Sequence, residues 1–241
     1  MNRLLGFITG ITSVIVGLSP VQAITIIDIP PATNSVAGVF GEIMMPGQGV
    51  SGAYGQTITV PDKETVLADF TFTLGGGLVL IDGRRADPIV NFAGYVAAWD
   101  SVNSRAVGSI LYRSAPRSYF VDEVFVKTES FTFNTGGLNL VSGQQYILFL
   151  SAFELFNGTP DGAVVLIRTD NPYTGGDFFV NNGVDFSSLT TTSWNNSGND
   201  MVFKATFIAP ASVPETSSAV ALSALGFLGL VLNQSKKPIN S

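Results

Sequence analysis

Apolar and polar side chains alternate along several short runs in the middle of the chain. From Leu67 to Leu74 a threonine follows each phenylalanine, which places the two kinds of side chain on opposite faces of a strand. The same period of two recurs at 131–133 and 201–207, and a longer, nearly continuous apolar run covers 146–153. These patterns predict β-strands. Further strands are predicted at Gln56–Val60, Val90–Trp99, Ser109–Tyr112, Val164–Arg168 and Phe178–Asn181.

Clusters of Gly, Asn, Asp and Pro separate these runs, and helical periodicity is weak outside the two termini. Eight or nine short strands with no intervening helix predict an all-β fold, namely an antiparallel β-sandwich. Long and uneven connections favour a jelly-roll-like arrangement over a simple meander. We expect the regularly placed phenylalanines to form the core.

The first 23 residues have the pattern of a secretory signal peptide. Arg3 supplies the positive start, Leu4 to Leu18 an apolar stretch that predicts a signal helix, and Val21-Gln22-Ala23 a small-x-Ala cleavage site. Cleavage after Ala23 would start the mature chain near Ile24. An uncleaved signal anchor is the alternative, although the stretch is shorter than a typical span of about 20 residues.

The last 29 residues have the order of a sorting tail. A box at 213–218 precedes an apolar run from Ala219 to Leu232, which predicts a hydrophobic helix, and Lys236 and Lys237 form a basic end. The run would rise about 21 Å, which is short against a hydrocarbon core of roughly 30 Å. The lysines place the extreme C-terminus in the cytoplasm by the positive-inside rule. A buried helix is the alternative for this run.

The box Val213-Pro214-Glu215-Thr216, with the apolar run and lysines behind it, resembles the C-terminal signal of PEP-CTERM proteins of Gram-negative bacteria. Thr216 stands where that family most often has its second proline. The segments YVAAWD, FTFNTGGLNL, GQQYILFLS and FKATF are similar to parts of other exported PEP-CTERM proteins. The resemblance implies export, processing by an exosortase-type enzyme, contact with the inner membrane through the tail before processing, and association with exopolysaccharide production.

Residues 24–212 remain as one domain, with 9 Lys and Arg against 17 Asp and Glu. This acidic balance argues against nucleic acid as a partner, because such binding needs a basic face. The chain contains no Cys and no His, which excludes Ser-His-Asp and Cys-His catalysis and removes the usual zinc ligands. We expect no cofactor.

Tryptophan and tyrosine combine a flat apolar ring with a polar tip, which suits stacking on sugars. Trp194 lies in a segment rich in Ser, Thr and Asn that predicts a surface loop, so we prefer it as a ligand contact, followed by Trp99 and Tyr173. Ordinary core packing is the alternative for all three rings.

Oxygen ligands are frequent in the second half of the chain, and calcium takes six to eight of them. Asp170, Asp177 and Asp185 are the candidate ligands. Asn, Asp and Gly also build tight turns through side-chain hydrogen bonds, and we favour this interpretation over a calcium site.

A glycoside hydrolase needs only two carboxylates, so this reaction survives the lack of His and Cys. The candidates are Glu42, Glu64, Glu129, Glu154 and Asp100, with Glu154 the first to examine. The sequence and the resemblance nevertheless predict a non-catalytic, exported protein, sorted by its tail, that acts as a binding or structural component of the cell envelope or extracellular matrix. Carbohydrate binding is the natural extension of the resemblance. A carbohydrate-active hydrolase is the alternative.

Overall fold

The computed structural model describes residues 22–31, 35–42, 52–75, 80–81, 84–85, 88–121, 128–159, 164–170, 172–183 and 185–211. The chain divides into two units, residues 1–209 and 210–241. The predicted signal helix and the predicted C-terminal helix both lie outside the described residues. Within the described ranges, no helix is long and apolar enough to cross a membrane.

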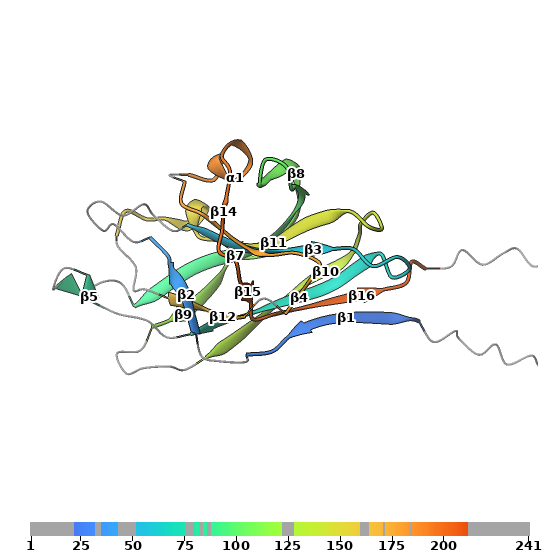
Figure 1. Cartoon of the computed structure of the whole chain (residues 1–241). Coiled ribbons are helices and arrows are strands. Elements are labelled where there is room, and N and C mark those ends of the chain that lie inside the picture. The colour runs from blue at the N-terminus through green and yellow to red at the C-terminus, as the bar shows by residue number, and fades with distance from the viewer. Residues whose placement is uncertain are drawn as a thin grey trace, which may run out of the picture. The chain divides into compact units, whose positions relative to one another are not determined.

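The first unit is built from two antiparallel sheets packed as a sandwich (Figure 1). Sheet A has the order β1 (Ile24–Ile29), β16 (Phe203–Ile208), β4 (Val66–Gly75), β12 (Val164–Thr169) and β15 (Asp200–Met201), with β10 (Glu129–Asn139) paired to β4 and β2 (Ser35–Phe40) to β12. Sheet B has the order β14 (Asn195–Asn196), β13 (Phe178–Asn181), β3 (Ala53–Thr59), β11 (Gln145–Ser151), β7 (Ile89–Asp100) and β8 (Arg105–Arg113), with β9 (Arg117–Phe120) paired to β7. The prediction of an antiparallel β-sandwich is confirmed.

Three smaller elements complete the described structure. Strands β5 (Leu80–Ile81) and β6 (Arg84–Arg85) pair with each other. A 3-10 helix, η1 (Phe153–Leu155), follows β11, and a short α-helix, α1 (Ser188–Thr191), lies between β13 and β14. The sequence predicted no helix between strands, so these two single turns are a difference from expectation.

The main core lies between the two sheets. Phe70 and Phe72 of β4 and Phe92 of β7 are fully buried in it. Alternation explains the arrangement, because the threonines between these phenylalanines point to the outer face of sheet A. The phenylalanines therefore form the core, as their spacing predicted.

Sheet B is covered on its outer face as well. Tyr95 and Phe149 stack there at 5.0 Å between ring centroids, within a second apolar cluster that includes Leu189 of α1 and Trp194. Every residue of β11 from Tyr146 to Ser151 is buried, because both faces of this strand are covered. The nearly continuous apolar run in the sequence has this cause.

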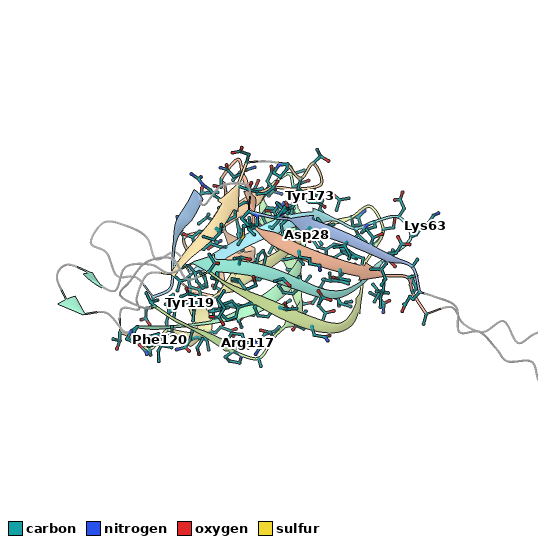
Figure 2. All side chains as sticks on the ribbon, turned by 90° about the horizontal axis from the view of Figure 1, so that it is seen from below. Asp28, Lys63, Arg117, Tyr119, Phe120 and Tyr173 are labelled. Carbon is teal, nitrogen blue, oxygen red and sulfur yellow. The ribbon has the colours of Figure 1, made fainter. Side chains whose placement is uncertain are left out.

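Strands β1 and β16 pair along their whole length in sheet A, from Ile24↔Ile208 to Ile29↔Phe203. Ile24 pairs with Ile208, and Ile208 in turn pairs with Val66 at the start of β4. Near the other end of β4, Leu74 pairs with Glu129 of β10. Leu74 lies eight positions after Val66, which corresponds to about 26 Å along a strand. The sandwich therefore has two distinct ends, marked by Lys63 and Phe120 in Figure 2.

Candidate ligand-binding groove

A groove with a volume of about 560 Å³ lies between β9 and β10. Its lining comes from both sheets: Pro116, Arg117, Ser118, Glu129, Ser130, Phe131 and Thr132. All of these residues except Phe131 are exposed. The groove is therefore open to solvent and mostly polar.

Strand pairing fixes the two walls of the groove. In β9, Arg117 and Ser118 pair with Phe92 and Asn91 of β7. In β10, Glu129 and Ser130 pair with Leu74 and Thr73 of β4. In the described structure β9 pairs only with β7 and β10 only with β4, so each wall is an edge strand of its sheet. The groove runs where the edges of the two sheets face each other.

The main core continues beneath the groove. Phe131 is 9% exposed, and its ring meets Phe92 at 5.0 Å and Tyr119 at 6.2 Å between centroids. These contacts tie β10 to β9 in the opposite wall and to β7 behind it. The groove consequently has a rigid apolar floor under its polar walls.

Each hydroxyl of the walls is held in position by a neighbour. Ser118 donates to Asn91 Oδ1 at 2.7 Å, Ser130 shares a hydrogen bond with Thr73 at 3.0 Å, and Thr132 shares one with Thr71 at 2.8 Å. A hydroxyl has one donor and two acceptor lone pairs. These groups therefore keep hydrogen-bonding capacity for a ligand while their positions are fixed.

One cation and one carboxylate belong to opposite walls of the groove. Arg117 carries five N–H donors, and an ionised Glu129 carboxylate offers only acceptors. Both charges act on nearby tyrosines. Burial raises the pKa of Tyr112, and the positive charge of Arg117 opposes this rise. Burial also raises the pKa of Tyr119, and the negative charge of Glu129 adds to that rise. Donors, acceptors and hydroxyls together match a ligand that carries many hydroxyl groups.

The aromatic residues expected to contact a ligand lie elsewhere. Trp194 is 3% exposed, meets Trp99 at 6.0 Å and Phe149 at 5.5 Å, and donates its indole N–H to Leu189 O at 2.9 Å. The surface position predicted for Trp194 is therefore wrong. The polar residues around it face solvent, whereas the indole turns inward to cover sheet B.

Trp99 and Tyr173 are also engaged in packing. Trp99 is 8% exposed and lies 4.6 Å from the Phe179 ring. The Tyr173 hydroxyl accepts from the Thr59 N–H at 3.2 Å, and burial raises its pKa. Neither ring lines the groove, and the alternative of core packing describes Trp99 better than a ligand contact does.

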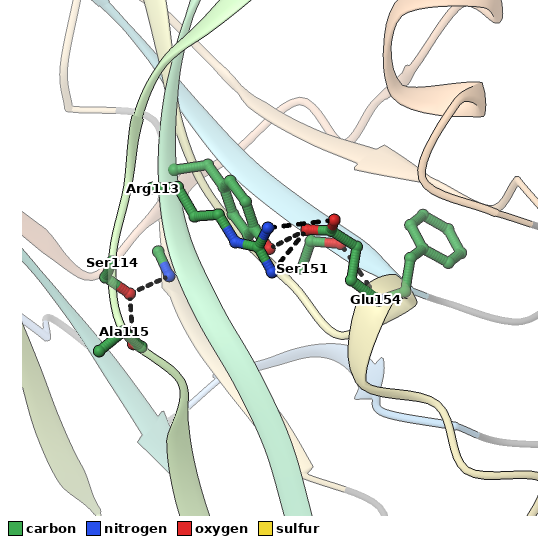
Figure 3. Close-up of polar contacts among 8 residues, drawn as sticks. Arg113, Ser114, Ala115, Ser151 and Glu154 are labelled. Carbon is green, nitrogen blue, oxygen red and sulfur yellow. Dashed lines mark hydrogen bonds and ion pairs between the residues drawn. The ribbon is translucent and has the colours of Figure 1, made fainter.

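Glu154 lies in a cluster of three side chains (Figure 3). Its Oε2 accepts from the Tyr95 hydroxyl at 2.9 Å and lies 3.1 Å from Arg113 Nη2, while its Oε1 accepts from Arg113 Nη1 at 3.2 Å. Burial, followed by the bond to Glu154, raises the pKa of Tyr95 well above its usual range. The carboxylate thus ties η1 to β7 and β8.

The other candidate carboxylates occupy separate places. Glu42 accepts the backbone N–H groups of Asn157 and Gly158 at 2.6 and 2.8 Å, and Glu64 accepts the Thr25 hydroxyl at 3.0 Å. Asp100 accepts from Asn103 Nδ2 at 2.6 Å and from backbone N–H groups of the β7–β8 turn, and these bonds lower its pKa. Glu129 is the one carboxylate among the residues that line the groove.

Two of the calcium candidates accept hydrogen bonds from nearby protein groups. Asp185 Oδ1 accepts from the Ser187 hydroxyl at 2.7 Å and the Ser188 N–H at 3.1 Å, which lowers its pKa. Asp177 Oδ2 accepts from Asn196 Nδ2 at 3.2 Å, and Asp170 is exposed after β12. Among the described side chains, no three Asp or Glu residues gather as a metal site would require.

The sorting residues Val213, Pro214, Glu215, Thr216, Lys236 and Lys237 lie outside the described residues. Ala23, the predicted cleavage residue, is described: its carbonyl accepts the Ala209 N–H at 3.1 Å. This bond continues the pairing of β1 with β16 by one step.

Sequence reasoning found Glu129 as a carboxylate but did not place it in a groove. It did not select Arg117, Ser118, Ser130 or Thr132. The alternation around Phe131 already placed Thr132 on the opposite face of a strand. No pattern in the sequence pointed to Arg117, because β9 has only four residues.

No known family profile matches the chain, and no curated protein matches it. Among solved structures, it is similar to the crystal structure of the cysteine protease and lectin-like domains of Cwp84, a surface layer associated protein of Clostridium difficile. The identity is 10%, the match covers 66% of this chain and 32% of that one, and the TM-score is 0.40. The match thus spans about a third of that structure.

Proposed function

We propose that this protein is a non-catalytic, exported carbohydrate-binding protein whose ligand lies in the β9–β10 groove. The observation that carries the proposal is the lining of the groove, where one guanidinium, one carboxylate and three fixed hydroxyls surround an aromatic floor. Sugars present alternating hydroxyl donors and acceptors, which such a lining can match. Hydrolysis would need a second carboxylate beside Glu129.

The proposal includes export and sorting by a PEP-CTERM-type tail. The predicted cleavage after Ala23 falls immediately before β1 begins, and the box begins at Val213, five positions after β16 ends. The folded strands thus fit between the two predicted processing sites. The partners are the export machinery, an exosortase-type enzyme and, before processing, the inner membrane. The destination is the cell surface or extracellular matrix.

The position of the groove supports a surface role. Glu129 lies beside Leu74, about 26 Å along β4 from the end where β16 stops at Ile208. Residues that follow Ile208 lead to the sorting tail. A ligand in the groove would therefore bind away from the point where the domain connects to its tail.

The proposal also includes a jelly-roll arrangement of the two sheets. Successive long strands change sheets repeatedly, from β3 in sheet B to β4 in sheet A, and from β10 through β11 and β12 to β13. Such crossing between two antiparallel sheets is typical of jelly rolls, which occur in lectin domains among others.

Binding to an array of oligosaccharides and polysaccharides tests the proposal. The full chain, purified in detergent, is compared with the Arg117→Ala variant and with a matched control, Lys63→Ala. Both residues are exposed cations, but Lys63 lies in the turn between β3 and β4 at the other end of the sandwich (Figure 2). We expect at least one ligand whose binding falls in Arg117→Ala and not in Lys63→Ala. Absence of binding across the array, or equal loss in both variants, would contradict the proposal.

A further inference from the structure

Phe120 presents an unusually exposed aromatic ring beside the groove. It ends strand β9, and 64% of it is exposed. Its register partner on the adjacent strand β7 is Ile89, which is 41% exposed. A single exposed apolar residue is ordinary, but two that face each other on adjacent strands form a patch.

This patch is continuous with one wall of the groove. Side chains alternate along β9, so Ser118 and Phe120 point to the same face, while Tyr119 between them is 2% exposed and points into the core. Ser118 lines the groove, and its hydroxyl donates to Asn91 Oδ1 at 2.7 Å. Asn91 and Ile89 repeat the same order on β7, a polar residue and then an apolar one.

Two residues along a strand advance about 6.6 Å, a step comparable to one pyranose unit. A sugar chain that begins in the groove would therefore place its next ring over Phe120. The apolar C–H face of a pyranose packs against an aromatic ring, and Phe120, without a polar tip, offers only such contact. We infer that Phe120 forms a second, stacking subsite, so that the ligand is a glycan of at least two units. This inference rests on the proposed function.

The charges of the groove favour a neutral glycan. Arg117 and Glu129 balance each other among the lining residues. Residues 24–212 carry more acidic than basic side chains, so a polyanionic chain would meet repulsion from the domain as a whole. Stacking on Phe120 does not depend on charge and adds to the hydrogen bonds in the groove.

The test is a length series. Full-length protein in detergent is titrated with oligomers of one to six units made from glucose, galactose, mannose or their uronic acids, as wild type, Phe120→Ala, Phe120→Trp and Val102→Ala. Val102 is the matched control, because it is 90% exposed in the turn between β7 and β8. We expect wild-type affinity for a neutral series to rise about tenfold from one unit to two or more. Phe120→Ala should lose this rise, whereas Phe120→Trp and Val102→Ala should keep it.

The outcomes separate this inference from the proposed function. If the wild type binds none of the oligomers and polysaccharides, the proposed function fails. If it binds them, Arg117→Ala weakens binding and Phe120→Ala matches wild type at every length, only the stacking subsite fails. Sedimentation gives a third outcome: a wild-type dimer that Phe120→Ala converts to monomer would show that the patch binds a second copy, and would overturn the inference.

Discussion

Trp194 donates its indole N–H to the carbonyl of Leu189, and this bond closes a cap over the outer face of sheet B. Trp194→Ala should destabilise the domain by about 3–5 kcal/mol, because it removes a buried ring and leaves a cavity. Urea denaturation measures the change. Val102→Ala should stay within about 0.5 kcal/mol of wild type. A similarly small effect for Trp194→Ala would show that the cap does not contribute to folding.

Gly94 permits close approach of the two sheets. A Cβ at this position would lie 2.6 Å from Cδ1 of Phe133 in the opposite sheet. Gly94→Ala should cost about 1–3 kcal/mol through overpacking. Adding Phe133→Ala should make the double variant more stable than the sum of the two single effects predicts, because alanine lacks the Cγ and Cδ1 atoms that a Cβ at position 94 would meet. If the changes in the free energy of unfolding of the two single variants simply add in the double variant, the contact between positions 94 and 133 is contradicted.

The raised pKa of Tyr95 leads us to expect that the folded domain loses stability at alkaline pH. Its pKa is raised above its ordinary value of 10.0 in the folded protein, so the unfolded chain releases this proton first as the pH rises. Stability that is present below pH 10 is therefore lost above it, by up to about 1.4 kcal/mol per pH unit for one group. Urea denaturation at pH 8 and pH 11 measures the free energy of unfolding. Its loss between the two pH values should be smaller for Tyr95→Phe than for wild type. An equal difference in both would contradict the assignment.

Chelator should leave the melting temperature unchanged. Carboxylate oxygens of Asp185 and Asp177 already accept hydrogen bonds from Ser187, Ser188 and Asn196, and Asp185 shapes the turn before α1. Thermal denaturation in EDTA and in millimolar calcium provides the measurement. A rise of several degrees with calcium, lost in Asp177→Asn, would establish a stabilising calcium site instead.

Alternation predicted those strands that have one face in the core and one in solvent. The run Phe70 to Thr73 is clear for this reason, and so is Phe203 to Phe207. Strand β1 was not predicted, because its sequence ITIIDI does not alternate: it lies at the edge of sheet A, where Ile24 and Ile26 stay exposed. Local pattern carries no information about which strand becomes an edge.

The groove could not be predicted, because its walls meet only through the sheet pairing. Arg117 and Glu129 are 12 residues apart and belong to different sheets, so neither position suggests the other. The prediction of a surface position for Trp194 was wrong for a related reason. Its polar sequence neighbours indicated a surface loop, but the cluster that buries it comes from β7, β11 and α1.

The most direct test of glycan binding in the groove is a map of amide chemical shifts in the full chain, with and without the tightest-binding oligosaccharide. Changes should concentrate at Arg117, Ser118, Glu129, Ser130 and Thr132, extend to Phe120 for ligands of two or more units, and spare Lys63. Changes centred on another face, or none at a saturating concentration, would contradict the account.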